Sequence, residues 1–169
     1  MARNIEIKAR VANPAALRER VATLATEGPA EIAQDDTFFN CSTGRLKLRA
    51  FSNTHGELIF YQRSDRHGPK ESYYVRTSTA EPETLRQTLA LAYGEAGRVR
   101  KQRTLFLVGR TRIHLDVVEH LGSFLELEVV LGEGESAEAG AREAEELMER
   151  LGVKASQLVD RAYVDLLSE

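Results

Sequence analysis

The chain has 169 residues, a net charge of −3 and 29% charged residues. This is the size and composition of one globular domain, which we predict to cover residues 1–169. The charge balance excludes bulk nucleic-acid binding through a strongly basic chain, and no segment is apolar enough to cross a membrane. The lone Cys41 excludes an internal disulfide and fits a reducing compartment, so we expect a cytoplasmic protein.

The first predicted element is a strand with two different faces. In "RNIEIKARV", Ile5 and Ile7 point to one side, whereas Asn4, Glu6 and Lys8 point to the other. The polar face meets either water or a polar cavity. This strand alone leaves both interpretations open.

A helix is predicted next, because Asn13 is a good N-cap and Pro14 suits the first helical position. Gly28 and Pro29 are expected to end that helix. The remaining predicted elements are strands over 30–40, 45–51 and 57–63, a loop over 64–72, a strand over 73–79, a helix over 81–94, strands over 97–108, 111–122 and 123–131, a helix over 136–152, and a short C-terminal helix with a tail over 156–169. This order predicts one α+β domain built on an antiparallel sheet or barrel.

Charged side chains follow the period of the strands. One strand has a basic face, and a late strand places Glu126 and Glu128 on the same side. By the same alternation, Arg98 and Arg100 point away from Lys101. The residues that share faces in this way are Arg45, Lys47 and Arg49, then Lys101 and Arg103, then Arg112, His114 and Asp116.

These two kinds of charged face suit two kinds of ligand. Guanidinium groups bind phosphate oxygens in pairs, so the basic faces suit a polyphosphate. The paired carboxylates of Glu126 and Glu128 suit a hard divalent cation such as Mg²⁺ or Mn²⁺. Bases for phosphate and acids for a metal ion are the combination that phosphoryl chemistry uses.

In this order the residues resemble the CYTH superfamily, also called triphosphate tunnel metalloenzymes. Its signature is an N-terminal strand with the pattern Glu-x-Glu-x-Lys, which Glu6 and Lys8 match in their last two positions. Basic strands and a late strand with paired glutamates follow. The resemblance implies a closed antiparallel barrel of eight strands with helices outside and a charged tunnel inside. The run "TRIHLD…LGSFLELE" looks most like the class IV adenylyl cyclase subgroup.

The resemblance also implies roles for individual residues. It implies Mg²⁺ or Mn²⁺ as the cofactor, held by Glu6, Glu126 and Glu128. It implies a catalytic group of Glu6, Lys8 and Asp116. The predicted substrate-binding residues are Lys8, Arg45, Lys47, Arg49, Arg63, Lys70, Lys101, Arg103 and Arg112.

Four positions, namely Asn4, His114, Asp116 and Lys70, allow more than one interpretation. Asn4 stands where the signature has its first Glu, and an amide brings an oxygen ligand without a charge. His114 is either a general base or a hydrogen-bonded structural residue. Asp116 either helps to hold metal or orients Arg112 or Lys101. Lys70 either closes over substrate or is a solvated loop residue.

The leading hypothesis is an enzyme that acts on a small-molecule triphosphate. In the cyclase version, ATP gives cyclic AMP and pyrophosphate; in the triphosphatase version, thiamine triphosphate or tripolyphosphate is hydrolysed. A non-catalytic polyphosphate or nucleotide-binding module is the alternative, because of Asn4. We expect no nucleic-acid partner, since the acidic residues would repel its backbone, and no membrane partner. A homodimer remains open.

Overall fold

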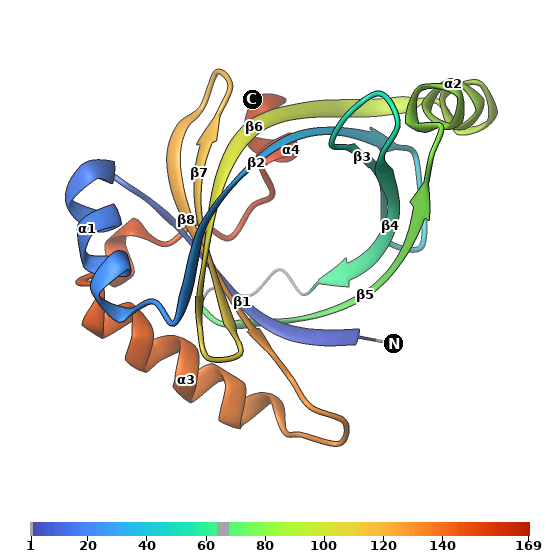
Figure 1. Cartoon of the computed structure of the whole chain (residues 1–169). Coiled ribbons are helices and arrows are strands. Elements are labelled where there is room, and N and C mark those ends of the chain that lie inside the picture. Colours follow the sequence, from blue (N-terminus) through green and yellow to red (C-terminus); the bar gives the residue numbers. More distant parts are fainter. Residues whose placement is uncertain (1, 64–67) are drawn as a thin grey trace.

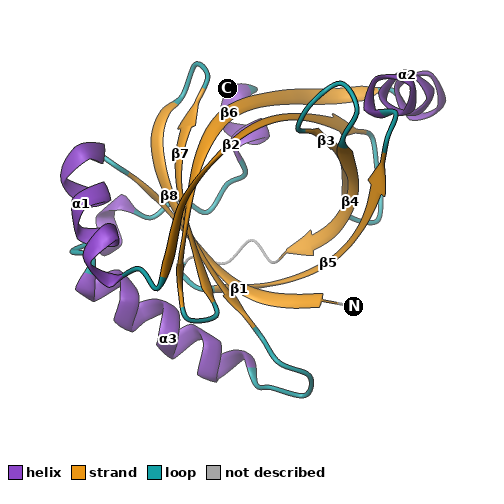
Figure 2. Cartoon of the chain, in the orientation of Figure 1, coloured by secondary structure: helices purple, strands orange, loops and turns teal. Residues whose placement is uncertain are grey.

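The structure is a computed structural model that describes residues 2–63 and 68–169. Eight antiparallel strands close into one barrel in the order β1-β5-β4-β3-β2-β6-β7-β8. The helices lie outside the ring of strands (Figures 1 and 2). The predicted closed barrel of eight strands with external helices is therefore confirmed.

The elements have the following bounds. The strands are β1 Ala2–Arg10, β2 Glu27–Phe39, β3 Arg45–Ala50, β4 Gly56–Arg63, β5 Lys70–Thr79, β6 Glu95–Val108, β7 Thr111–Val118 and β8 Gly122–Val130. The helices are α1 Pro14–Leu24, α2 Pro82–Tyr93, α3 Ala137–Arg150 and α4 Tyr163–Leu167, with a 3₁₀ turn η1 at Ala155–Gln157.

The main hydrophobic core lies outside the barrel, between its wall and two helices. Ile5 and Ile7 of β1 point outward into this core, where they meet Val21 of α1 and Ala144 and Leu147 of α3. All five side chains are buried. Burying each aliphatic side chain contributes about 1.5–3 kcal/mol, so this face fixes which way β1 turns. Its polar side chains then have to point into the barrel.

The segment around Gly28 and Pro29 differs from the prediction. The α1 helix ends at Leu24, and these two residues lie inside β2 rather than at the end of the helix. The register of β2 against β6 shifts between Glu27 and Ala30, which marks a bulge. A bulge accepts a proline because no ladder hydrogen bond is required there, and Gly28 adopts a positive φ of 104°.

The expected loop over 64–72 is shorter than predicted. Residues 64–67 lie outside the described part of the chain, and β5 already begins at Lys70. Lys70 pairs in register with Glu6, and its ammonium donates to the carbonyl of Asp160 at 2.5 Å. Pairing and burial therefore hold this lysine in a strand, where it is 5% exposed.

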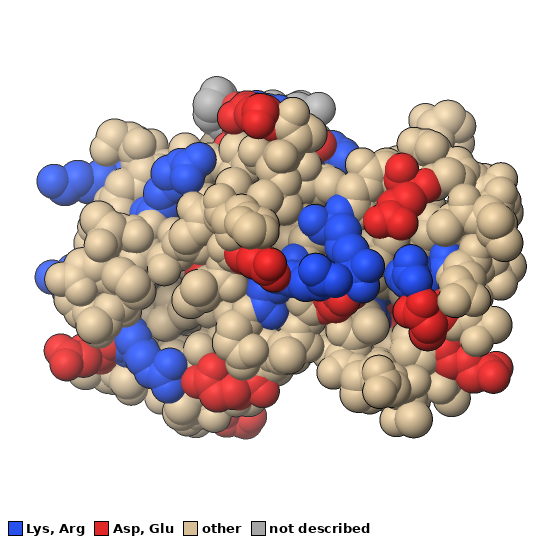
Figure 3. Space-filling view, turned by 90° about the horizontal axis from the view of Figure 1, so that it is seen from above, with Lys and Arg blue, Asp and Glu red and all other residues tan. Residues whose placement is uncertain are grey.

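The outer surface of the barrel carries the two arginines that were predicted to point away from the cavity. Arg98 and Arg100 do point outward, and both contact Asp35 on the neighbouring strand. On the face in Figure 3, a central group of basic side chains has acidic side chains at its borders. Within the described residues, no helix combines the length and the apolar character needed to cross a membrane.

Candidate functional site

A cavity of about 300 Å³ lies inside the barrel, with side chains from all eight strands on its wall. Eight basic and five acidic side chains line it, so its wall is strongly charged and carries a basic excess. The basic side chains are Lys8, Lys47, Arg49, Arg63, Arg76, Lys101, Arg103 and Arg112. The acidic side chains are Glu6, Asp36, Glu57, Glu126 and Glu128.

Three polar atoms on this wall are buried without a hydrogen-bond partner. They are Asn4 Oδ1, Gln34 Oε1 and His114 Nδ1, and no other buried side-chain atom in the described residues shares this property. A buried polar group without a partner costs about 1–3 kcal/mol. Their gathering on one cavity wall indicates that these groups are arranged for a ligand or water rather than for the protein itself.

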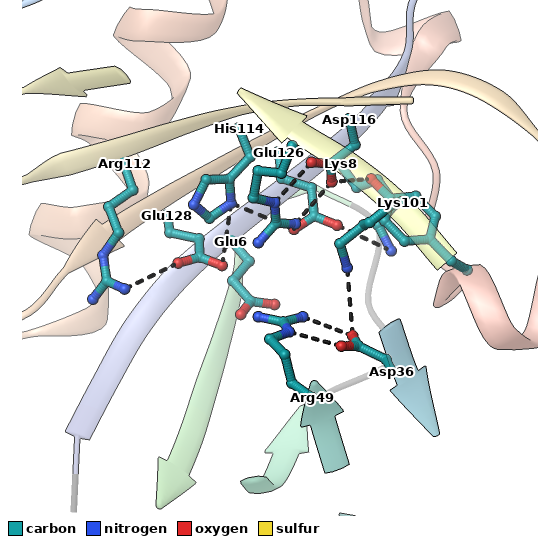
Figure 4. Close-up of polar contacts among 12 residues, drawn as sticks. Glu6, Lys8, Asp36, Arg49, Lys101, Arg112, His114, Asp116, Glu126 and Glu128 are labelled. Atoms are coloured by element: carbon teal, nitrogen blue, oxygen red, sulfur yellow. Dashed lines mark hydrogen bonds and ion pairs between the residues drawn. The ribbon is translucent and has the colours of Figure 1, made fainter. Parts of the chain in front are cut away.

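The side chains of His114, Glu126 and Glu128 form a compact cluster, which we call the acid cluster. One ligand atom from each lies within 4.8 Å of the other two. His114 Nδ1 is 3.8 Å from Glu126 Oε2 and 3.7 Å from Glu128 Oε1. The register explains the grouping, since β7 places His114 directly opposite Glu126 on β8. Figure 4 shows the three side chains turned toward one another.

Glu6 lies beside this cluster on the neighbouring strand. It pairs in register with Glu128, and its Oε2 is 3.4 Å from Arg63 Nη1. Burial, followed by the charge of Glu128, raises the pKa of Glu6 to about 7. The sequence prediction grouped Glu6 with Glu126 and Glu128, whereas the compact cluster contains His114 in its place.

This donor set fits a hard divalent cation. Carboxylate oxygens are the ligands that Mg²⁺ and Mn²⁺ prefer, and imidazole adds a donor that transition metals accept. Burial would raise the pKa of Glu126, but the charges of Lys8 and Arg103 outweigh burial and hold that pKa well below its ordinary value. Glu126 is therefore ionised at neutral pH and ready to act as a ligand.

Asp116 holds Arg103, and this arginine links it to the acid cluster through Glu126. Arg103 donates two hydrogen bonds of 2.7 Å to the Asp116 carboxylate, and Tyr163 donates a third of 2.9 Å. Burial opposes ionisation, but the charge of Arg103 lowers the pKa of Asp116. The sequence offered Arg112 or Lys101 as the partner of Asp116. The arginine that it orients is Arg103, which in turn lies 3.2 Å from Glu126.

A second buried carboxylate, Asp36, gathers the bases of the opposite wall. Arg49 donates to it twice, at 2.8 and 2.7 Å, and Lys47 and Lys101 lie 3.3 and 3.5 Å from it. Asp36 was not among the site residues predicted from the sequence. The signal was present, because Gln34, Asp36 and Phe38 alternate with the outward residues of the same strand.

The remaining predicted residues fall into two groups. Arg112 lines the cavity, and its guanidinium is 4.0 Å from Glu128. Lys70 lines a small adjoining pocket together with Glu6, Lys8 and Arg63. Arg45 differs from the rest, since its guanidinium contacts Asp165 of α4 at 2.6 Å and is not on the cavity wall.

The raised pKa of Glu6 predicts a stability effect in metal-free protein. The folded pKa of about 7 exceeds the ordinary value of 4.5, so the unfolded chain loses this proton first. Glu6 therefore destabilises the fold increasingly as pH rises from about 4.5 to about 7, and by a constant amount at higher pH. We expect Glu6→Gln to be more stable than wild type by about 2 kcal/mol at pH 8, and nearly equal to it at pH 4.5. Urea denaturation with a chelator measures both values. The same difference at both pH values would show that Glu6 titrates normally.

Known proteins share this fold and sequence pattern. The CYTH domain family model matches residues 2–163. The PH1012 protein from Pyrococcus horikoshii OT3 is 24% identical, with a TM-score of 0.87, and the alignment covers 96% of this chain and 98% of that one. For a "putative adenylate cyclase" from Vibrio parahaemolyticus the identity is 20%, the TM-score 0.76 and both coverages 98%.

A more distant structure is HpAC1 from Hippeastrum, a "putative adenylyl cyclase" described as having a dominant triphosphatase activity. It is 14% identical, with a TM-score of 0.62, and the alignment covers 90% of this chain and 89% of that one. At these identities the likeness to solved structures shows the fold alone. No curated protein matches the sequence. The family model, in contrast, covers nearly the whole chain, and this chain therefore belongs to the CYTH domain family.

Proposed function

We propose that this chain is a metal-dependent enzyme that acts on a triphosphate compound bound in the barrel cavity. The observation that carries the proposal is one cavity wall that brings together eight basic side chains, the acid cluster and Glu6. Such a wall is costly without a ligand, because like charges repel and buried charges lose hydration. A polyphosphate with a divalent cation satisfies both kinds of side chain.

Within this proposal the residues divide between two tasks. Lys8, Lys47 and Arg63 bind phosphate oxygens, as do Arg112 and the paired Arg49 and Arg103. Glu6, Glu126 and Glu128 hold Mg²⁺ or Mn²⁺, and His114 is positioned to add a nitrogen donor. The bound cation supplies neutralisation of the charge that develops on the phosphate oxygens. Asp116 takes part by fixing Arg103 rather than by holding the cation.

The leading reaction is that of a class IV adenylyl cyclase, as the late-strand resemblance implies. The ribose 3′-oxygen of ATP attacks the α-phosphorus, the bond to the β-phosphate oxygen breaks, and cyclic AMP and pyrophosphate form. The hydroxyl proton passes to solvent or to a cavity carboxylate. The basic side chains hold the β- and γ-phosphates in place, so the leaving pyrophosphate is stabilised as its charge grows.

Hydrolysis of the terminal phosphate is the second candidate. The observation that favours it is the cavity volume of about 300 Å³, which is at the lower end of the usual range for ligand pockets. A compact tripolyphosphate suits this volume better than a nucleotide does. In that reaction water attacks the terminal phosphorus and the bond from that phosphorus to the bridging oxygen breaks. Orthophosphate and the shortened phosphate chain form, and the same side chains bind the shortened chain.

Product analysis distinguishes these reactions. The protein is incubated with Mn²⁺ or Mg²⁺ and, in separate samples, ATP, thiamine triphosphate or tripolyphosphate, and products are separated by anion-exchange chromatography. Cyclic AMP with equimolar pyrophosphate from ATP is the expected result for the cyclase. For the triphosphatase the expected result is orthophosphate with an equal amount of ADP, thiamine diphosphate or pyrophosphate, according to the substrate, and no cyclic AMP. Saturable binding of all three compounds without any product would show a binding module instead and would contradict the proposed enzyme.

A further inference from the structure

The C-terminal segment forms part of the cavity wall through Ala162 and Tyr163. Leu158 bridges to Ala9, and the amide of Val159 donates to the carbonyl of Lys8, which fixes the segment to β1. The chain then runs to β6, beside which α4 begins (Figure 1). Here Tyr163 packs edge-on against Phe124, with their ring centres 4.9 Å apart. Tyr163 is the cavity-lining residue nearest to the C-terminus of the chain.

Tyr163 contacts two of the predicted phosphate-binding lysines at once. The ammonium of Lys8 lies 4.1 Å from the centre of its ring, and that of Lys101 lies 5.3 Å from it. These lysines come from β1 and β6, so the ring joins two walls of the barrel that do not pair. Both ammonium groups are within the distance at which an aromatic face attracts a cation.

The aromatic ring attracts these lysines without adding a negative charge to the site, which a carboxylate cannot do. Lys8 also lies 3.7 Å from Glu126, and Lys101 lies 3.5 Å from Asp36. A full ion pair with either acid competes with an incoming phosphate for the same ammonium hydrogens. An aromatic face attracts the cation without a negative charge of its own, so it orients the lysine and does not repel an anion as a carboxylate does.

We propose that Tyr163 is a positioning residue for the triphosphate, whose ring seats Lys8 and Lys101 so that both meet the same end of the bound chain. This inference rests on the proposed function, because it presupposes an anionic ligand in the cavity. The ring carries the effect rather than the hydroxyl. The hydroxyl donates to Asp116, which Arg103 already holds through two shorter hydrogen bonds.

Two substitutions separate ring from hydroxyl. Tyr163→Phe keeps the aromatic face, and Tyr163→Leu removes it at similar apolar character. We expect Tyr163→Leu to weaken tripolyphosphate binding about tenfold, the usual size of a desolvated cation–aromatic contact, and Tyr163→Phe to weaken it less than about threefold. Tyr93→Leu is the matched control, since Tyr93 is 58% exposed on α2 and is outside the cavity wall.

Calorimetric titration of tripolyphosphate in the presence of Mg²⁺ measures these affinities, and KM and kcat are recorded for any substrate turned over. The expected result is a rise in KM for Tyr163→Leu alone. Equal losses in the leucine and phenylalanine variants would assign the effect to the hydroxyl and overturn the proposal, as would unchanged binding in both. A wild-type protein that binds no tripolyphosphate would instead remove the proposed function, and this inference with it.

A second measurement keeps the proposal testable if Tyr163→Leu fails to fold. In protein with ¹³C-labelled lysine, the chain gives five lysine signals, and ring currents should shift the Hε protons of Lys8 and Lys101 upfield. We expect these shifts in wild type and in Tyr163→Phe. Lys154, far along the chain in an exposed position, is the internal reference. Unshifted signals for Lys8 and Lys101 would show that the ring does not seat them.

Discussion

Replacing both Glu126 and Glu128 with glutamine is expected to reduce metal-dependent turnover of the triphosphate substrate by at least about 100-fold. Even residues that only support metal ligands commonly cost 10–100-fold, and these two carboxylates are the charged members of the acid cluster. Glutamine preserves the shape of each side chain and removes its charge, so the change acts on cation binding first. Initial rates over a range of Mn²⁺ concentrations measure the loss.

The matched control carries the same two changes outside the cavity. Glu145→Gln with Glu149→Gln removes two exposed charges from α3, and we expect turnover within about twofold of wild type. Thermal unfolding of both variants without metal shows whether the fold is intact. Turnover retained in a folded Glu126→Gln, Glu128→Gln protein would contradict the metal assignment.

Asp116→Ala is expected to destabilise the fold by about 3 kcal/mol, because the buried Arg103 guanidinium loses its two hydrogen bonds of 2.7 Å and keeps only the longer contact with Glu126 at 3.2 Å. Both side chains are almost completely buried, since Asp116 is 0% exposed and Arg103 is 5% exposed. Asp116 is thus predicted to act on activity through the structure of the site. Urea denaturation of wild type and variant gives the difference in the free energy of unfolding.

A closely similar ion pair on the surface provides the comparison. Arg98 donates two hydrogen bonds of 2.8 Å to Asp35, but both side chains are about one-third exposed. Asp35→Ala should therefore cost no more than about 1 kcal/mol. If the two alanine variants lose equal stability, burial does not control the strength of the Asp116–Arg103 ion pair. That result would contradict the structural role predicted for Asp116.

The alternation of side chains in single strands predicted which residues share a face, and the family resemblance predicted that the charged faces line a cavity. Ile5 and Ile7 are apolar and had to meet the core, so Glu6 and Lys8 had to point the other way once the barrel closed. The same reasoning predicted that Arg98 points outward, as the structure confirms. These predictions succeeded because strand periodicity is a local property of the backbone.

Features that depend on packing between distant segments were not predictable in this way. Arg45 has the same parity as Lys47, yet the docking of α4 brings Asp165 beside it and draws its guanidinium off the cavity wall. Tyr163 enters the cavity for the same reason, since no pattern in a short C-terminal helix indicates where it docks. The pairing of Asp116 with Arg103 depends on the register of β6 against β7, which sequence alone left open.

The most direct test is a crystal structure of the protein grown with Mn²⁺ and tripolyphosphate, with anomalous diffraction used to locate the metal. We expect a manganese peak in contact with the carboxylates of Glu126 and Glu128 and a phosphate chain among the cavity lysines and arginines. A cavity that stays filled with water alone, while manganese binds only at surface acids, would contradict the proposed function.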